Sequence, residues 1–85
     1  MTTDRADVRC RILLRLRAWP AVDDGTAAWL RALPWRVRRV LLLTHGDGLT
    51  QDQVAVRLRL SVRTVRRYLD FAYTSYEEAF RGELN

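Results

Sequence analysis

The spacing of apolar residues predicts a chain built from helices. Apolar positions recur at intervals of three and four along most of the sequence, which is the period of one face of an α-helix. Sustained alternation of apolar and polar residues is absent, and no Asn-Gly or Asp-Gly pair separates two β-branched runs as it would in a β-hairpin. We therefore predict an all-α fold, a small bundle of about five helices.

The first predicted helix covers about residues 4–18 and ends before Pro20. Its apolar stripe consists of Val8, Ile12, Leu16 and Trp19. Five arginines cover the rest of its surface. A basic amphipathic helix can lie on a membrane, but a helix of this length with a domain behind it more often docks on its own core, which is the arrangement we predict.

Two more helices are expected before residue 46. Residues 21–26 form a linker, and Asp23, Asp24 or Thr26 can cap a short helix that ends near residue 32. Pro34 suits the first turn of the next helix, which runs to about His45.

The helix that follows Pro34 has two apolar sides. Its inner face consists of Leu33, Val37, Val40, Leu41 and Thr44. Trp35 and Leu42 fall on the opposite side and form either an exposed stripe or, as we slightly favour, a surface packed on the first helix. Gly46 is expected to end the helix in a left-handed conformation.

The stretch from residue 50 onward predicts a helix-turn-helix. Thr50 and Gln53 have the spacing of a capping box, and Ser61 can cap the last helix. The inner stripe of that last helix consists of Val62, Val65, Leu69, Ala72, Tyr76 and Phe80. Two capped helices joined by a short turn are typical of this motif.

The polar face of the second helix of the motif predicts contacts with DNA. In a helix-turn-helix this helix enters the major groove with its N-terminal end. Arg63 and Arg67 fall on the outer side with Thr64 beside them, while Arg66 is placed nearer the core boundary. A solvated face is the alternative for any single arginine, but four such residues after a capped turn favour DNA.

Arginine donates forked hydrogen bonds to guanine or phosphate, and the free amides at the start of the Thr50 helix suit a phosphate. We expect Gln51, Arg57 and Arg59 to assist there. The predicted DNA-contacting residues are thus Thr50, Gln51, Arg57, Arg59, Ser61, Arg63, Thr64, Arg66 and Arg67.

The distribution of charged residues along the chain favours a polyanionic binding partner. The chain of 85 residues has a net charge of +5, and all 15 basic residues are arginine, which GC-rich codon usage largely explains. Residues 33–70 carry eight arginines and three aspartates, whereas residues 71–85 are net negative. We divide the chain into an N-terminal helix and linker (1–29), a helix-turn-helix domain (30–76) and an acidic C-terminal tail (77–85).

Composition excludes several other classes. No apolar run approaches the roughly 20 residues that span a bilayer, and the N-terminus lacks the apolar centre of a signal peptide. Cys10 is the only cysteine, so a cytoplasmic location is expected. His45 is the only histidine and is expected to cap a helix or to be exposed. Without a Cys/His cluster, a phosphate-binding glycine loop or paired carboxylates, we predict neither enzyme activity nor a metal or other cofactor.

The segment LPWRVRRVLLLTHGDGLTQDQVAVRLRLSVRTVRRYL resembles region 4 of bacterial sigma factors, above all the extracytoplasmic-function type linked to iron uptake. The matching elements are Leu33-Pro34, the run from Arg36 to Leu43, Gly48-Leu49-Thr50, Gln53-Val54-Ala55, Leu58, Ser61 and Thr64-Val65. LuxR-type regulators share the four-helix unit and are the nearest competitor, but Leu33-Pro34 favours the sigma family. The resemblance covers about residues 30–76.

Two departures from that family stand out. Arg59 occupies the turn where the family usually has glycine, and a left-handed conformation there costs a non-glycine residue on the order of 1 kcal/mol. Sigma factors also carry region 2, which melts DNA, and residues 1–29 are too short to hold it. We therefore expect that this chain alone does not initiate transcription.

The resemblance implies a transcriptional regulator that binds duplex DNA in the major groove. Such modules usually act in pairs on half-sites, so a homodimer is expected, with Phe71, the first helix and the cluster of Tyr73, Tyr76 and Phe80 as candidate surfaces. The alternative is a module that binds RNA polymerase or a sigma or anti-sigma protein in the manner of region 4. The candidate partner-interface residues are Trp35, Leu42, Phe71, Tyr76 and Phe80.

Overall fold

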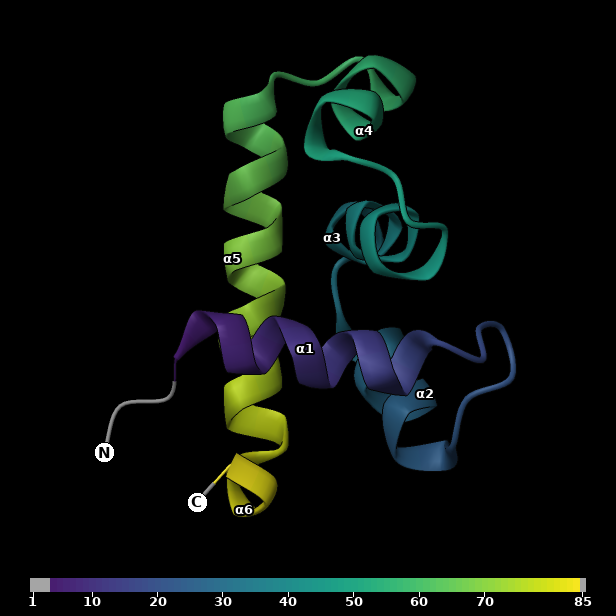
Figure 1. Cartoon of the computed structure of the whole chain (residues 1–85), viewed down its shortest axis with the longest axis vertical. Coiled ribbons are helices and arrows are strands. Elements are labelled where there is room, and N and C mark those ends of the chain that lie inside the picture. Colours follow the sequence, from purple (N-terminus) through teal and green to yellow (C-terminus); the bar gives the residue numbers. More distant parts are fainter. Residues whose placement is uncertain (1–3, 85) are drawn as a thin grey trace.

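The structure is a computed structural model that describes residues 4–84, and this part of the chain is helical without strands. The elements are α1 (Arg5–Leu16), α2 (Asp24–Ala32), α3 (Trp35–Leu41), the π-helical turn η1 (Leu42–Gly46), α4 (Gln51–Leu58), α5 (Val62–Ala79) and α6 (Arg81–Leu84). The all-α prediction is confirmed. Helix α5 forms the long axis, α3 and α4 lie along one side of its first half, and α1 crosses its second half (Figure 1). No helix in the described range is long and apolar enough to cross a membrane.

Helix α1 docks on the core, as its apolar stripe predicted. Val8, Ile12 and Leu16 are fully buried, and α1 contacts both α5 and η1. Burying each such side chain contributes about 1.5–3 kcal/mol. The fourth predicted member, Trp19, was placed wrongly, because α1 ends at Leu16 and Trp19 lies half-exposed in the turn that follows.

Helix α2 begins earlier than predicted because Asp23 caps it. The Asp23 carboxylate accepts a hydrogen bond from the backbone N–H of Thr26 at 2.7 Å, so the helix starts at Asp24. That bond lowers the pKa of Asp23 below its usual value. Thr26 is therefore not the cap but a buried residue of the first turn.

The helix that begins at Trp35 changes its hydrogen bonding after Leu41. The predicted single helix becomes α3 followed by η1, in which the N–H of Asp47 reaches back five residues to the carbonyl of Leu42 at 3.0 Å. A π turn rotates each residue by a smaller angle than an α turn does. The turn therefore brings His45 to the inner face, and the left-handed glycine is Gly48 (φ 76°), not Gly46.

The helix-turn-helix forms as the capping signals predicted. Thr50 and Gln53 exchange both hydrogen bonds of a capping box, and Ser61 caps α5. Between the helices, Arg59 adopts the left-handed conformation (φ 57°, ψ 46°), and the N–H of Leu60 bonds the carbonyl of Ala55 at 2.9 Å. This is the Schellman arrangement, with arginine at the position that usually holds glycine.

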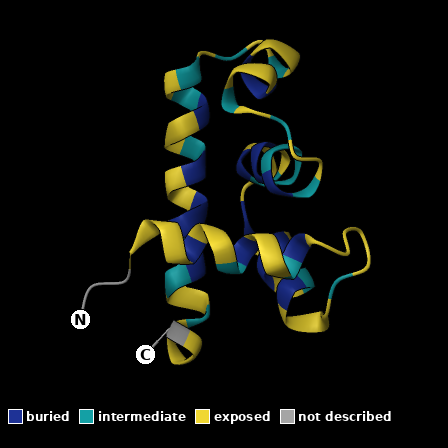
Figure 2. Ribbon diagram, viewed as in Figure 1, coloured by how far each residue is buried: buried dark blue, intermediate teal, exposed yellow. Residues whose placement is uncertain are grey.

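The buried side of α5 faces the other helices, and its exposed side faces away from them (Figure 2). Of its predicted inner stripe, Val65, Leu69, Ala72 and Tyr76 are buried. The two end members, Val62 and Phe80, are half-buried and pack against this core. Residues 77–79 continue α5 without a break, and α6 packs on the end of α5.

Candidate nucleic-acid interface

The start of α5 presents its arginines on a rigid base. Arg63 and Arg67 are exposed one helical turn apart. The Ser61 hydroxyl accepts a hydrogen bond from the N–H of Thr64 at 3.0 Å and donates one to the Thr64 hydroxyl oxygen at 2.9 Å. Ser61 and Thr64 thus order the first turn of α5, and the half-buried Thr64 lies beside the two arginines.

Arg66 links α5 to the start of α4. Its Nε donates to Oε1 of Gln51 at 3.0 Å, which leaves the two terminal nitrogens of the guanidinium for another partner. Arg66 was predicted nearer the core boundary, and its exposed side chain borders a cleft that the buried Leu69 and Tyr73 also line. Within the described residues, the N–H groups of Gln51 and Asp52 have no protein acceptor, so the first turn of α4 offers donors next to Arg66.

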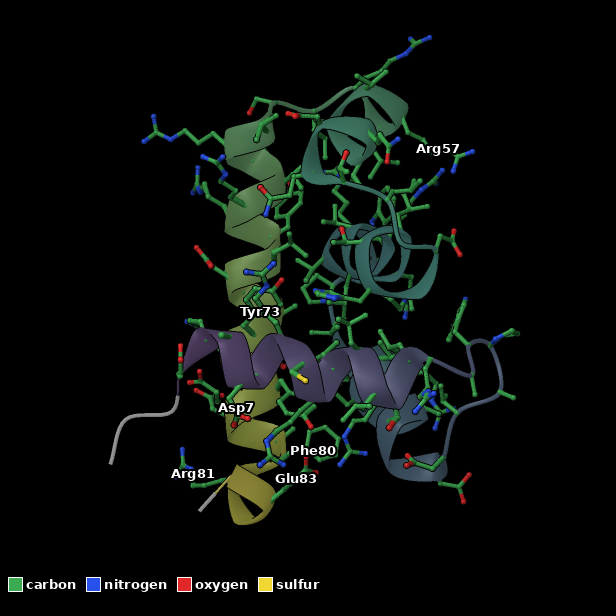
Figure 3. The ribbon with its side chains drawn as sticks, in the orientation of Figure 1. Asp7, Arg57, Tyr73, Phe80, Arg81 and Glu83 are labelled. Atoms are coloured by element: carbon green, nitrogen blue, oxygen red, sulfur yellow. The ribbon has the colours of Figure 1, made fainter. Side chains whose placement is uncertain are left out.

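Arg57 and Arg59 had been expected to assist at the first turn of α4. Arg57 borders a shallow cleft together with Asp52 and Gln53 of that turn, whereas Arg59 does not line that cleft. Both arginines line another cleft, of about 260 Å³, between the helix-turn-helix turn and α3. The other residues of this cleft are Trp35, Arg36, Arg39, Leu58 and Leu60. Arg57 points outward from α4 at the edge of the molecule (Figure 3). The cleft gathers four arginines without a carboxylate.

The expected stripe of Trp35 and Leu42 is divided in the structure. Leu42 is half-buried against the core, whereas 59% of Trp35 is exposed. Trp35 does not pack on α1, because it borders a cleft of about 690 Å³ between α3 and α5. Phe71, 52% exposed, lines the same cleft together with Tyr68. Trp35 and Phe71 are therefore the accessible pair among the predicted partner-interface residues.

Tyr76 cannot form a partner surface, which corrects the prediction. The residue is fully buried, with its ring 5.3 Å from that of Trp29 and 4.6 Å from that of Phe80. Phe80 is half-buried under the guanidinium of Arg15, whose Cζ lies 3.8 Å from the ring centroid. Tyr73 is buried as well. Tyr76 belongs to the core because Arg15 of α1, Trp29 of α2 and Glu83 of α6 all contact it.

Among the described residues, ion pairs form only within and between the two end segments of the chain, residues 5–23 and 77–83. Arg5 pairs with Glu77, Arg11 pairs with Asp7 and Glu83, and Arg15 pairs with Asp23 and Glu83. The eight arginines between residues 36 and 67 form no ion pair with any residue from 4 to 84. Their charge remains available to a partner.

His45 was predicted to cap a helix or to be exposed, and both expectations were wrong. The ring is buried, with Nε2 2.8 Å from the Tyr73 hydroxyl oxygen. Burial and the nearby charge of Arg9 lower the pKa of His45 to about 4. The neutral ring can accept a hydrogen bond from the Tyr73 hydroxyl at Nε2, so this pair joins η1 to α5 inside the core. The burial of His45 depends on the π turn, and helical periodicity in the sequence does not predict such a turn.

Comparison with known proteins identifies the matching family segment. A family model described as sigma-70, region 4 matches residues 28–74, which is more than half of the chain. The matched segment contains most of α2, the whole helix-turn-helix and most of α5, but not α1 or α6. No curated protein and no solved structure matches the chain.

Proposed function

This chain belongs to the sigma-70 region 4 family, and from that membership we propose that it is a transcriptional regulator that binds duplex DNA with the start of α5 in the major groove. A helix-turn-helix of this family is a DNA-binding unit. The cytoplasm, where bacterial DNA lies, is the location that this function requires.

The single observation that carries the proposal is the exposure of Arg63 and Arg67 on the capped first turns of α5, in a half of the molecule whose arginines lack ion pairs. Their guanidinium groups can donate two parallel hydrogen bonds to O6 and N7 of guanine or reach phosphates. Thr64 can contact a neighbouring base. The first turn of α4, with Thr50, Gln51 and Arg66, then suits the adjacent phosphates.

A binding titration tests this function. A preferred duplex is first selected from a random pool, and its affinity is measured by fluorescence anisotropy at several salt concentrations. Arg63→Ala/Arg67→Ala should weaken binding at least about tenfold, because one bidentate contact to guanine contributes about 1–3 kcal/mol. The matched control is Arg17→Ala/Arg31→Ala, which removes the same charge from two exposed arginines away from α5. An affinity that does not fall with salt, or equal losses in both double variants, would contradict the proposal.

Two copies on adjacent half-sites would give tighter binding than one. A single helix-turn-helix contacts few base pairs, and half-sites about 34–36 Å apart match two subunits of a dimer. Phe71 and α1 are the remaining candidate surfaces for a homodimer, since Tyr76 is buried. Light scattering of the chain with and without the selected duplex measures the number of copies bound.

A protein partner is the second candidate function. It is favoured by the cleft of about 690 Å³ beside Trp35 and Phe71, because two large exposed aromatic side chains on one cleft are suited to bind another protein. RNA polymerase, a sigma factor or an anti-sigma protein would be the partner. Trp35→Ala should abolish capture of purified RNA polymerase and leave DNA affinity unchanged. Capture that is unaffected by Trp35→Ala would exclude this cleft as the interface.

A further inference from the structure

Arg9 differs from the other arginines within α1. Arg5, Arg11 and Arg15 each have a carboxylate partner, whereas Arg9 has none among residues 4–84. Its side chain is exposed. Three arginines of α1 thus form ion pairs that hold the fold together, whereas Arg9 lies near the Tyr73 hydroxyl and has no carboxylate partner in the described residues.

Arg9 lies on the side of α1 that faces the helix-turn-helix. A cleft of about 230 Å³ between α1, the start of α4 and α5 is lined by Arg5, Arg9, Gln51, Arg66, Leu69, Asp70 and Tyr73. Three guanidinium groups and one carboxylate border it. The N-terminal end of α1 projects past α5 on the side away from α3 and α4 (Figure 1). On α5 this cleft is bordered by the exposed Arg66 and Asp70, whereas Arg67 borders the cleft beside Trp35 and Phe71 on the α3 side of the helix.

The buried groups nearest to Arg9, which are His45 and Tyr73, do not neutralise the charge of its guanidinium. Arg9 helps to lower the pKa of His45, and it opposes the increase in the Tyr73 pKa that burial causes. Both groups are uncharged near neutral pH. Arg66 faces the same cleft with its Nε already bonded to Gln51, so its two terminal nitrogens form a fixed fork. Two cationic groups from different helices thus border one opening.

We propose that Arg9 and Arg66 form a phosphate-binding site that holds the DNA backbone beside the major groove entered by α5. This inference rests on the proposed function. Arginine forks match phosphate geometry, and the unbonded N–H groups of Gln51 and Asp52 add donors at the same place. Because α1 lies outside the matched segment 28–74, Arg9 is a contribution of this chain's own first helix to the interface.

The salt dependence of DNA binding tests the site. Affinities for the selected duplex and for a mixed-sequence duplex are measured at several salt concentrations with wild type, Arg9→Ala, Arg9→Lys and Arg17→Ala. Arg17 is the matched control, because it is exposed, forms no ion pair among the described residues and follows the far end of α1. Arg9→Ala should reduce the slope of log affinity against log salt by about 0.9, the value for one lost phosphate contact.

The loss in Arg9→Ala should be several-fold and equal on both duplexes, because a phosphate contact does not read sequence. Arg9→Lys should keep the slope, and Arg17→Ala should leave it unchanged. Circular dichroism confirms that each variant is folded.

The outcomes separate this inference from the proposed function. If Arg63→Ala/Arg67→Ala weakens binding while Arg9→Ala behaves as Arg17→Ala does, the phosphate site is wrong and the function stands. If none of the variants changes affinity for either duplex, both proposals fail. A slope that falls equally in Arg9→Ala and Arg17→Ala would show a general charge effect and would also overturn the site.

Discussion

The two halves of α5 lie in opposite electrostatic surroundings. The first half carries Arg63, Arg66 and Arg67, and none of them forms an ion pair with a residue in the range 4–84. The second half is enclosed by α1, α2 and α6, where five ion-pair contacts link arginines to carboxylates. The same residue type therefore serves two purposes in one small molecule.

Arg15 shows how an arginine becomes part of a fold. Its guanidinium donates to the hydroxyl oxygens of Tyr76 (2.9 Å) and Thr26 (3.0 Å), pairs with Asp23 and Glu83, and covers the ring of Phe80. Most of its donors are thus satisfied internally. Arg63 has the same chemistry but no such neighbours, so its donors remain available. Neighbouring groups, rather than residue type, decide which arginines can bind a polyanion.

The substitution with the largest expected effect on this contrast between the two halves of α5 is Tyr76→Ala. Tyr76→Ala should lower the free energy of unfolding by about 3–5 kcal/mol, because a large buried aromatic side chain is lost and Arg15 loses a partner. Urea denaturation measures the loss. Arg63→Ala/Arg67→Ala should change stability by no more than about 0.5 kcal/mol. If Tyr76→Ala also weakens DNA binding at a temperature where it is folded, the two halves are coupled and the contrast fails.

A pH titration tests the junction between the halves, where His45 of η1 meets Tyr73 of α5. The folded state holds the pKa of His45 at about 4 against its usual 6.5, so the fold favours the neutral ring. The contribution of His45 to the free energy of unfolding is complete above pH 6.5 and is lost as pH falls toward 4. The total decrease in the free energy of unfolding is about 3 kcal/mol.

Unfolding by urea at a series of pH values measures that change. His45→Gln, which cannot gain the proton, should lack this part of the pH dependence. An equal decrease in wild type and variant between pH 6.5 and 4 would show that His45 is not the group responsible.

Glu83 is the next test, because it joins α6 to α1 and α5. Its carboxylate accepts a hydrogen bond from Tyr76 at 2.8 Å and pairs with Arg11 and Arg15. Burial tends to raise the pKa of Glu83, but the hydrogen bonds from Tyr76 and Arg15 outweigh it and place the pKa below the usual 4.5. The carboxylate therefore stabilises the fold above about pH 4.5, and this contribution disappears as pH falls through the lowered pKa.

Glu83→Gln should lower the free energy of unfolding at neutral pH by about 1 kcal/mol, and it should remove the part of the acid dependence that Glu83 causes. The exposed Glu78 is the control, since Glu78→Gln removes the same charge without breaking an ion pair in the described structure. Thermal unfolding measures both variants. Equal stability of the two would mean that the ion pairs of α6 contribute nothing.

The smallest expected effect concerns the turn of the helix-turn-helix. Arg59→Gly should raise the free energy of unfolding by no more than about 1 kcal/mol, because glycine adopts the left-handed conformation without strain. Arg57→Gly removes the same charge from within α4 and should instead lower stability by about 1 kcal/mol. A destabilised Arg59→Gly, measured by urea denaturation, would show that the Arg59 side chain supports the fold.

Local signals in the sequence were sufficient for the helix-turn-helix. A capping box depends on two residues three positions apart, and Ser61 bonds within its own first turn, so Thr50, Gln53 and Ser61 could be recognised without tertiary information. The exposure of Arg63 and Arg67 followed from helical periodicity alone. The apolar stripe of α1 likewise indicated the side that docks.

Contacts between distant parts of the chain escaped the sequence reasoning. Arg66 reaches Gln51, fifteen positions away, and helical periodicity cannot predict such a bond. Helical periodicity correctly placed Tyr76 on the inner stripe of α5, but the residue was also offered as a partner surface because the covering helices α1 and α6 come from the two ends of the chain. His45 was misplaced because a single π turn altered the direction in which it points.

The amino-acid order determined the helices, their caps and the basic outer face of α5, because these depend on interactions within a few positions. Apart from the pair of Arg11 with Asp7 one turn away in α1, tertiary structure decided which arginines are neutralised and which keep their charge, because the other ion pairs require a carboxylate brought near from outside the helix. The opening between Arg9 and Arg66 arises in the same way, from the angle at which α1 crosses α5.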